Sequence, residues 1–119
     1  MTLPKEEMEF FDVEKIAWKP LGQTPGYQNV TGVYEKILSI DKDTGSYTRM
    51  LKFEPGVETS ETLQHDFWEE VFILKGGLID KAKQQTFAEG MYACRPPGMK
   101  HGPYSSPIGC ITLETRYYR

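Results

Sequence analysis

Short runs of β-branched and aromatic residues, separated by Gly and Pro turns, follow one another along most of the chain. No long segment keeps a helical spacing of apolar positions, so the pattern favours an all-β domain, either a sandwich or a barrel. The clearest hairpin is predicted from residues 32–40 and 46–53, which are joined by the polar loop 41–45, DKDTG. Gly45 occupies the loop position that needs a positive φ.

The second strand of this hairpin carries Arg49, Leu51 and Phe53 at alternating positions. Side chains two residues apart in a strand lie on the same face of the sheet. We expect Leu51 and Phe53 to point inward. The same alternation places Arg49, a charged residue, on the inner face of the domain.

Further strands are predicted on both sides of this hairpin. Residues 15–19 predict an edge strand, and residues 7–11 before them predict a helical turn. Residues 69–74 predict the most apolar strand, which the turn at 75–77, KGG, should reverse so that residues 78–80 pair back. The remaining strands are expected at residues 61–65, 86–88, 91–95 and 108–117. About eight to ten short strands of this kind are typical of a double-sheet jelly roll.

Length and charge limit the classes of function. With 119 residues the chain is long enough for one compact domain and too short for two ordinary ones. We expect a single domain over residues 1–119, with an N-terminal arm at 1–30 and a barrel at 31–119. The formal net charge is −3, and the 14 basic residues are scattered along the chain rather than gathered into a stripe. This distribution argues against a nucleic-acid partner.

Hydropathy and cysteine usage predict the compartment. No apolar run approaches the roughly 20 residues that span a bilayer, and the first residues are too acidic for a signal peptide. Cys94 and Cys110 lie in apolar, strand-like surroundings and form no paired-thiol motif. We therefore expect a cytoplasmic protein without membrane contact, in which both thiols are buried and free. A disulfide between them is the alternative.

Both histidines occupy positions at which a metal site would use them. His65 lies four residues before Glu69, and His101 ends the run 95–101, RPPGMKH, whose Pro-Pro-Gly corner fixes the backbone. In a strand with His65 facing the barrel interior, a short turn would return Glu69 to the same interior. Two His and one carboxylate from distant parts of the chain predict a 2-His-1-carboxylate site with open coordination positions.

These motifs resemble those of the cupin family. The second cupin motif, a Gly, five residues, Pro-x-Gly, two residues and His, is matched from Gly90 to His101. The terminal Asn of that motif is replaced by Ser105. Residues 65–76 resemble the latter part of the first motif, which reads His, three residues, Glu, six residues and Gly. Over residues 46–117 the chain is similar to the cupins that resemble the metal-binding domain of the anti-sigma factor ChrR.

The resemblance implies a cupin double-stranded β-helix, which is a jelly-roll barrel, and a divalent transition metal held by His65, Glu69 and His101. Fe(II) is the first choice, and Zn, Ni or Mn are the alternatives. The chain departs from the family at the first position of the His-x-His pair, where Leu63 stands and cannot bind a metal. Two alternatives stay open: a register in which Gln64 faces the metal and His65 points away, and a metal-free cupin.

The resemblance also implies an activity on a small-molecule substrate. We expect first a non-haem iron dioxygenase that cleaves a carbonyl or aromatic compound, because an open three-ligand iron site admits both substrate and dioxygen. Tyr104, Arg49 and Arg95 are the candidate catalytic residues, which would orient the substrate. The alternatives are a metal-dependent isomerase, cyclase or lyase, and a non-catalytic cupin that senses a metal or a small molecule. We also expect a homodimer formed through the N-terminal strands and an exposed sheet.

Overall fold

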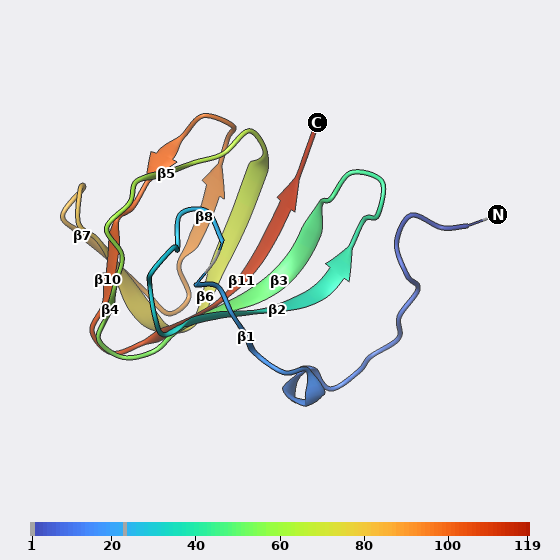
Figure 1. Ribbon diagram of the computed structural model, residues 1–119, viewed down its shortest axis with the longest axis horizontal. Helices are drawn as coiled ribbons and strands as arrows, with labels where there is room; N and C mark the ends of the chain where they lie inside the picture. The colour runs from blue at the N-terminus through green and yellow to red at the C-terminus, as the bar shows by residue number, and fades with distance from the viewer. Residues whose placement is uncertain (1, 23) are drawn as a thin grey trace.

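The computed structural model describes residues 2–22 and 24–119 of the chain. These residues form a short 3-10 helix, Val13–Lys15, followed by strands that curl into the half-open barrel shown in Figure 1. None of the described segments is a helix long and apolar enough to cross a membrane. The predicted all-β class is confirmed. The strands are β1 (Lys19–Pro20), β2 (Val33–Ile40), β3 (Tyr47–Phe53), β4 (Val57–Glu58), β5 (Leu63–Gln64), β6 (Trp68–Asp80), β7 (Gln85–Ala88), β8 (Tyr92–Arg95), β9 (Lys100–His101), β10 (Tyr104–Ser106) and β11 (Cys110–Tyr117).

Strand β6 connects the two sides of the barrel. Its first half pairs with β8 and β11, and its second half pairs with β7 and β10. The strand bends at Gly76, where φ is +76° and an added Cβ would lie 2.0 Å from the carbonyl oxygen of Gly109. The predicted reversal at residues 75–77 is therefore wrong, because the glycines bend one continuous strand from one layer into the other.

The hairpin predicted around Gly45 is confirmed as β2 and β3, and Gly45 has a φ of +78°. Arg49, Leu51 and Phe53 of β3 are all buried, so the predicted inner face is confirmed as well. The apolar core that this face covers consists of Leu21, Tyr27, Val33, Leu51, Phe53, Leu63, Ile73, Leu78, Tyr104 and Cys110.

The N-terminal segment differs from its prediction. Residues 7–11 form no helical turn, and the predicted strand 15–19 is reduced to its last residue. Trp18 lies between the ammonium groups of Lys36 and Lys52, which are 4.4 and 4.7 Å from its ring centre. Side-chain contacts therefore hold this segment on the sheet. The residues before it run beside the β2–β3 hairpin (Figure 1), where the backbone N–H of Lys42 donates to the carbonyl oxygen of Pro4 at 2.9 Å.

The loop between β1 and β2 packs tightly against β5. Tyr27 of this loop is buried in the core. Gly26 has a φ of +90°, and a Cβ added to it would lie 2.2 Å from Cδ2 of Leu63. No larger residue fits there without displacing Leu63 or the loop. This contact fixes the loop at the wall of the cavity described below.

The two cysteines have different surroundings. Both are free thiols, as predicted. Cys110 is buried, and burial raises the pKa of its thiol to about 12. Cys94 is exposed, so its predicted burial is wrong. It lies on β8 between residues that face the interior, and its own side chain faces outward.

Candidate metal centre

Strands β5 and β9 bring the two histidines to one side of the barrel. Leu63 pairs directly with His101, and opposed residues of an antiparallel pair point to the same face. Both side chains are buried. Gln64 is exposed, and its amide Nε2 donates to the carbonyl oxygen of Gly98 at 3.0 Å. The alternative register, with Gln64 facing the metal, is therefore wrong.

The structure assembles the three predicted ligands into one cluster. Nitrogen and oxygen atoms of His65, Glu69 and His101 that can bind a metal all lie within 4.8 Å of one another. The two imidazole rings are 5.2 Å apart between centres, and Nε2 of His101 is 3.9 Å from Oε1 of Glu69. Glu69 and His101 are buried, and His65 is half-buried.

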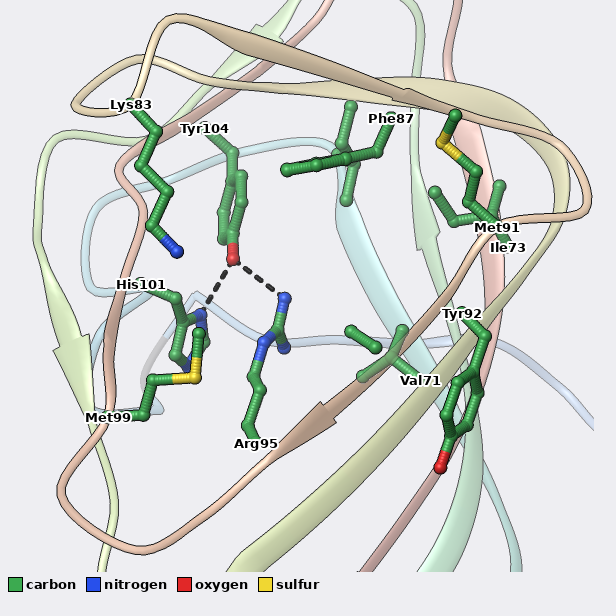
Figure 2. A pocket seen from close by; sticks show the side chains of 12 residues that line it. Val71, Ile73, Lys83, Phe87, Met91, Tyr92, Arg95, Met99, His101 and Tyr104 are labelled. Atoms are coloured by element: carbon green, nitrogen blue, oxygen red, sulfur yellow. Dashed lines mark hydrogen bonds between the residues drawn. The ribbon is translucent and has the colours of Figure 1, made fainter.

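His101 is oriented by Tyr104. The imidazole Nδ1 lies 2.7 Å from the Tyr104 hydroxyl, which also accepts a hydrogen bond of 2.9 Å from Arg95 (Figure 2). The other imidazole nitrogen, Nε2, is buried and has no hydrogen-bond partner. Buried polar atoms are nearly always satisfied, so an orphaned Nε2 beside two further ligand atoms fits a divalent metal.

Glu69 is held by Arg95, which stands directly opposite it on β8. The guanidinium Nη1 donates to Oε1 of Glu69 at 2.6 Å. A carboxylate has about four acceptor sites, so this ion pair leaves Glu69 able to bind a metal as well. Burial, and next the carboxylate of Glu114, raise the pKa of Glu69, whereas Arg95 opposes the rise. A bound cation would favour the ionised carboxylate in the same way as Arg95 does.

Both histidines favour the neutral form. Burial, and next the positive charge of Arg95, lower the pKa of His101 to about 3. Burial also lowers the pKa of His65. A metal binds the neutral imidazole, so both side chains are in the binding form at neutral pH.

The cluster lies in the wall of a cavity of about 200 Å³ inside the barrel. An apolar cavity of about 150 Å³ holds a benzene molecule, so the space suits a small organic molecule. One row of inward-facing residues crosses the sheet at the level of the cluster: Tyr47 on β3, Arg116 on β11, Glu69 on β6 and Arg95 on β8.

Arg49 lies one row deeper than the cluster. Its Nε donates to Oε1 of Glu114 at 3.0 Å, and its Nη1 donates to Oε2 of Glu35 at 2.8 Å. Two carboxylates therefore occupy its guanidinium. Arg95 and Tyr104, the other two candidate catalytic residues, lie directly beside the ligands. The catalytic role of all three residues stays a prediction.

An apolar recess of about 120 Å³ lies on the other side of Arg95, His101 and Tyr104, which line both spaces. Figure 2 shows Lys83 reaching along Tyr104 toward His101 at the edge of this recess. Its apolar lining includes Val71, Ile73, Leu78, Phe87, Met91, Ala93 and Met99. The three polar side chains, together with Val71 and Leu78, therefore lie between the cavity and the recess.

Two further charged residues line the cavity, Glu114 and Arg116, and neither was predicted from the sequence. Both lie on β11 and face inward, as Thr112 does, whereas Leu113 faces outward. The period-two alternation of charged and apolar residues in this strand was the available signal. This alternation identifies the two faces of the strand, but it does not determine which face points into the barrel.

Comparison with solved structures shows the same fold at low sequence identity. An acetylacetone dioxygenase from Acinetobacter johnsonii superposes with a TM-score of 0.68 at 19% identity, over 92% of this chain and 72% of that one. The polyketide cyclase RemF from Streptomyces resistomycificus gives 0.69 at 17% identity, over 92% and 80%. The Rhodobacter sphaeroides complex of SigE with the anti-sigma ChrR gives 0.63 at 20% identity, over 89% and 52%.

No curated protein sequence matches the chain. The sequence model of the ChrR cupin-like domain does match it, over residues 6–117. This match covers nearly the whole chain, including the β5 to β9 region that supplies the metal-ligand cluster. The barrel with its inward-facing His and Glu residues is the architecture that the sequence motifs implied. The chain therefore belongs to the ChrR cupin-like family within the cupin superfamily.

Proposed function

We propose that this protein is a metal-dependent cupin enzyme that acts on a small organic molecule. His65, Glu69 and His101 would hold the metal, and the cavity of about 200 Å³ beside them would hold the substrate. The buried Nε2 of His101, which has no partner, carries the proposal. A protein that used this cluster only for packing would leave that nitrogen unsatisfied at a cost in stability.

Within this class we favour a non-haem iron dioxygenase that cleaves a carbonyl or aromatic compound. Fe(II), when bound, would supply the activation of dioxygen. Arg95 and Tyr104 lie beside the ligands, where their hydrogen-bonding groups would orient a substrate carbonyl or hydroxyl. The shared fold of an acetylacetone dioxygenase is consistent with this activity.

One observation favours a second candidate, a cyclase or isomerase that needs no dioxygen. The Tyr104 hydroxyl lies beside Nδ1 of His101, and burial raises its pKa, so it stays a neutral hydroxyl. A neutral hydroxyl at this place would donate a hydrogen bond to a substrate carbonyl polarised by Zn, Ni or Mn. The polyketide cyclase RemF shares the fold.

Metal content tests the class of enzyme. Protein purified without a His tag should contain about one divalent transition metal per chain by elemental analysis, because three protein ligands suffice for such a site. His101→Ala should lose the metal. Gln64→Ala, which changes an exposed neighbour of the site, is the matched control and should keep it. Full metal retention by His101→Ala would refute the site.

Oxygen uptake then separates the two reactions. The iron-loaded and zinc-loaded proteins are offered β-diketones, hydroxyacetophenones and catechols in an oxygen electrode. Uptake by the iron form alone supports the dioxygenase. Turnover by the zinc form without uptake supports the cyclase or isomerase. No turnover by any metal form would favour a binding or sensing module.

A further inference from the structure

Three guanidinium groups line the cavity within the described part of the chain, and Arg116 differs from the other two in its partners. Arg49 is paired with the carboxylate of Glu114, and Arg95 is paired with that of Glu69. Arg116 has no carboxylate at ion-pair distance among the described residues. It is the cavity cation whose charge the protein does not balance by direct contact.

Two aromatic rings hold the guanidinium of Arg116. Its central carbon lies 3.9 Å from the ring centre of Tyr47 and 4.7 Å from that of Phe67. Rings that contact a guanidinium face fix its plane and leave the N–H groups at its edge to bind other partners. Its Nε is buried and has no hydrogen-bond partner in the protein. The guanidinium is therefore positioned by the two rings, and its buried Nε is unsatisfied.

The same aromatic contacts connect Arg116 to the metal-ligand cluster. The Phe67 ring stacks on the imidazole of His65, with 4.5 Å between ring centres and 11° between ring planes. Arg116 is also the direct cross-strand neighbour of Glu69. The guanidinium and the cluster thus line one cavity, and the Phe67 ring contacts both Arg116 and His65.

We propose that Arg116 binds a carboxylate of the substrate, so that the carbonyl or aromatic substrates of this enzyme are small organic acids. The planar fork of an arginine matches a carboxylate and binds it through two parallel N–H to oxygen hydrogen bonds. The remaining part of the same molecule lies toward His65 and Glu69. This inference rests on the proposed function for the metal half of the site, whereas the carboxylate half stands on Arg116 alone.

Calorimetric titration of two probe pairs tests the proposal. Benzoate and propanoate are compared with benzamide and propanamide, on zinc-loaded protein and on protein freed of metal with a chelator. The metal-free protein is included because a carboxylate can also bind zinc directly. We expect both forms to bind the acids at least about tenfold more tightly than the amides, since a charged hydrogen bond is stronger than a neutral one.

Arg116→Met keeps an apolar stem between the two rings and removes the charge. It should weaken binding of the acids about 10- to 100-fold in both forms. It should not weaken zinc binding, because it removes a positive charge that acts on His65. Arg119→Met is the matched control, because it removes the same charge from an exposed position three residues away. It should change neither affinity. If Arg116→Met does not fold, Arg116→Lys is used instead. It keeps the charge and loses only the planar fork, so it should weaken binding of the acids less than the loss of the charge would.

The outcomes separate this inference from the proposed function. Failure to bind zinc would refute the metal site, while acid binding by the metal-free protein would still test Arg116. Equal benzoate affinity of wild type and the Arg116 variant would overturn the inference. Wild-type protein that binds the acids no better than the amides, or binds none of the probes, would overturn it as well.

Discussion

Tyr104 and His101 are joined by a contact of 2.7 Å between the phenol oxygen and the imidazole Nδ1. Because Nδ1 is engaged in this way, the other nitrogen, Nε2, is the one that faces Glu69. Arg95 donates to the same phenol oxygen and restrains it further. Tyr104 therefore orients a candidate metal ligand without being one itself.

The first prediction follows from this contact. Tyr104→Phe keeps the buried ring and removes the hydroxyl, so we expect zinc affinity to fall about 10- to 100-fold. Competition with a chromophoric chelator measures the change. Tyr92→Phe removes a hydroxyl from an exposed tyrosine and should leave the affinity as in wild type. Equal affinities of the Tyr104 variant and wild type would show that the hydroxyl does not orient His101.

The second prediction concerns the stability of the metal-free protein as the pH changes. Burial lowers the pKa of His101 from 6.5 to about 3, so the unfolded chain binds more protons than the folded protein between these values. The stability that neutral His101 contributes is fully present above pH 6.5 and is lost as the pH falls toward the folded value. From pH 7 to pH 5 this contribution should fall by about 2 kcal/mol.

Urea unfolding at both pH values, in the presence of a chelator, measures this loss. Glu69 acts in the opposite direction, because burial raises the pKa of its carboxyl group and protonation then relieves the penalty at low pH. Glu69 is present in both wild type and His101→Gln, so its contribution cancels when the pH dependence of the two proteins is compared. The drop in unfolding free energy should be about 2 kcal/mol smaller in the variant. Parallel pH profiles would contradict the argument.

The third prediction concerns Leu63, which occupies the place of a fourth ligand. It pairs with His101 and is buried on the same face, so Leu63→His should add an imidazole to the cluster and tighten zinc binding. Without metal, lost packing against the loop at Gly26 should cost about 2 kcal/mol or more. Zinc titration and thermal unfolding in chelator measure the two effects. Leu63→Ile is the control, and a crystal structure in which the introduced imidazole points to solvent would refute the expectation.

The fourth prediction is a homodimer through the outer face of the sheet. Met50, Leu113, Phe72 and Tyr92 form one row across β3, β11, β6 and β8 on this face. Phe72 is 41% exposed and Tyr92 is 57% exposed, so the row is an apolar surface without cover in the single chain.

Light scattering at micromolar concentration should give twice the 13.7 kDa mass of the chain. Phe72→Glu places a charge in the row and should give the monomer. Lys75→Glu, which changes the charge at an exposed position of the same strand, should keep the dimer. A wild-type protein with the monomer mass would rule out this interface.

The hairpin and the ligand cluster could be predicted because their signals are local. Period-two alternation with a glycine turn determines a hairpin within about 20 residues, and the histidine motifs report ligand types directly. The glycines at 76 and 77 carry a weaker signal. A pair of glycines is compatible with a chain reversal and also with a bend in a continuous strand. Here the strand bends because Gly76 packs against the carbonyl of Gly109, which is distant in sequence.

The charges of the cavity could not be predicted for a different reason. Strand β11 places Glu114 and Arg116 inside and Leu113 outside, against the usual rule that apolar residues face the core. Which face of β11 points inward depends on the strands that pair with it. These strands are β3 and β6, and neither is adjacent to β11 in the chain.

Leu63 and Gly26 have to be considered as a pair in any redesign of this barrel. A Cβ at position 26 would meet Leu63 at 2.2 Å, so added volume at either position must move the loop that walls the cavity. Substitutions at the two positions will therefore not be additive. Exchange of Leu63 for an imidazole removes the contact that holds the loop, so a mutational route from three candidate metal ligands to four requires the loop to repack.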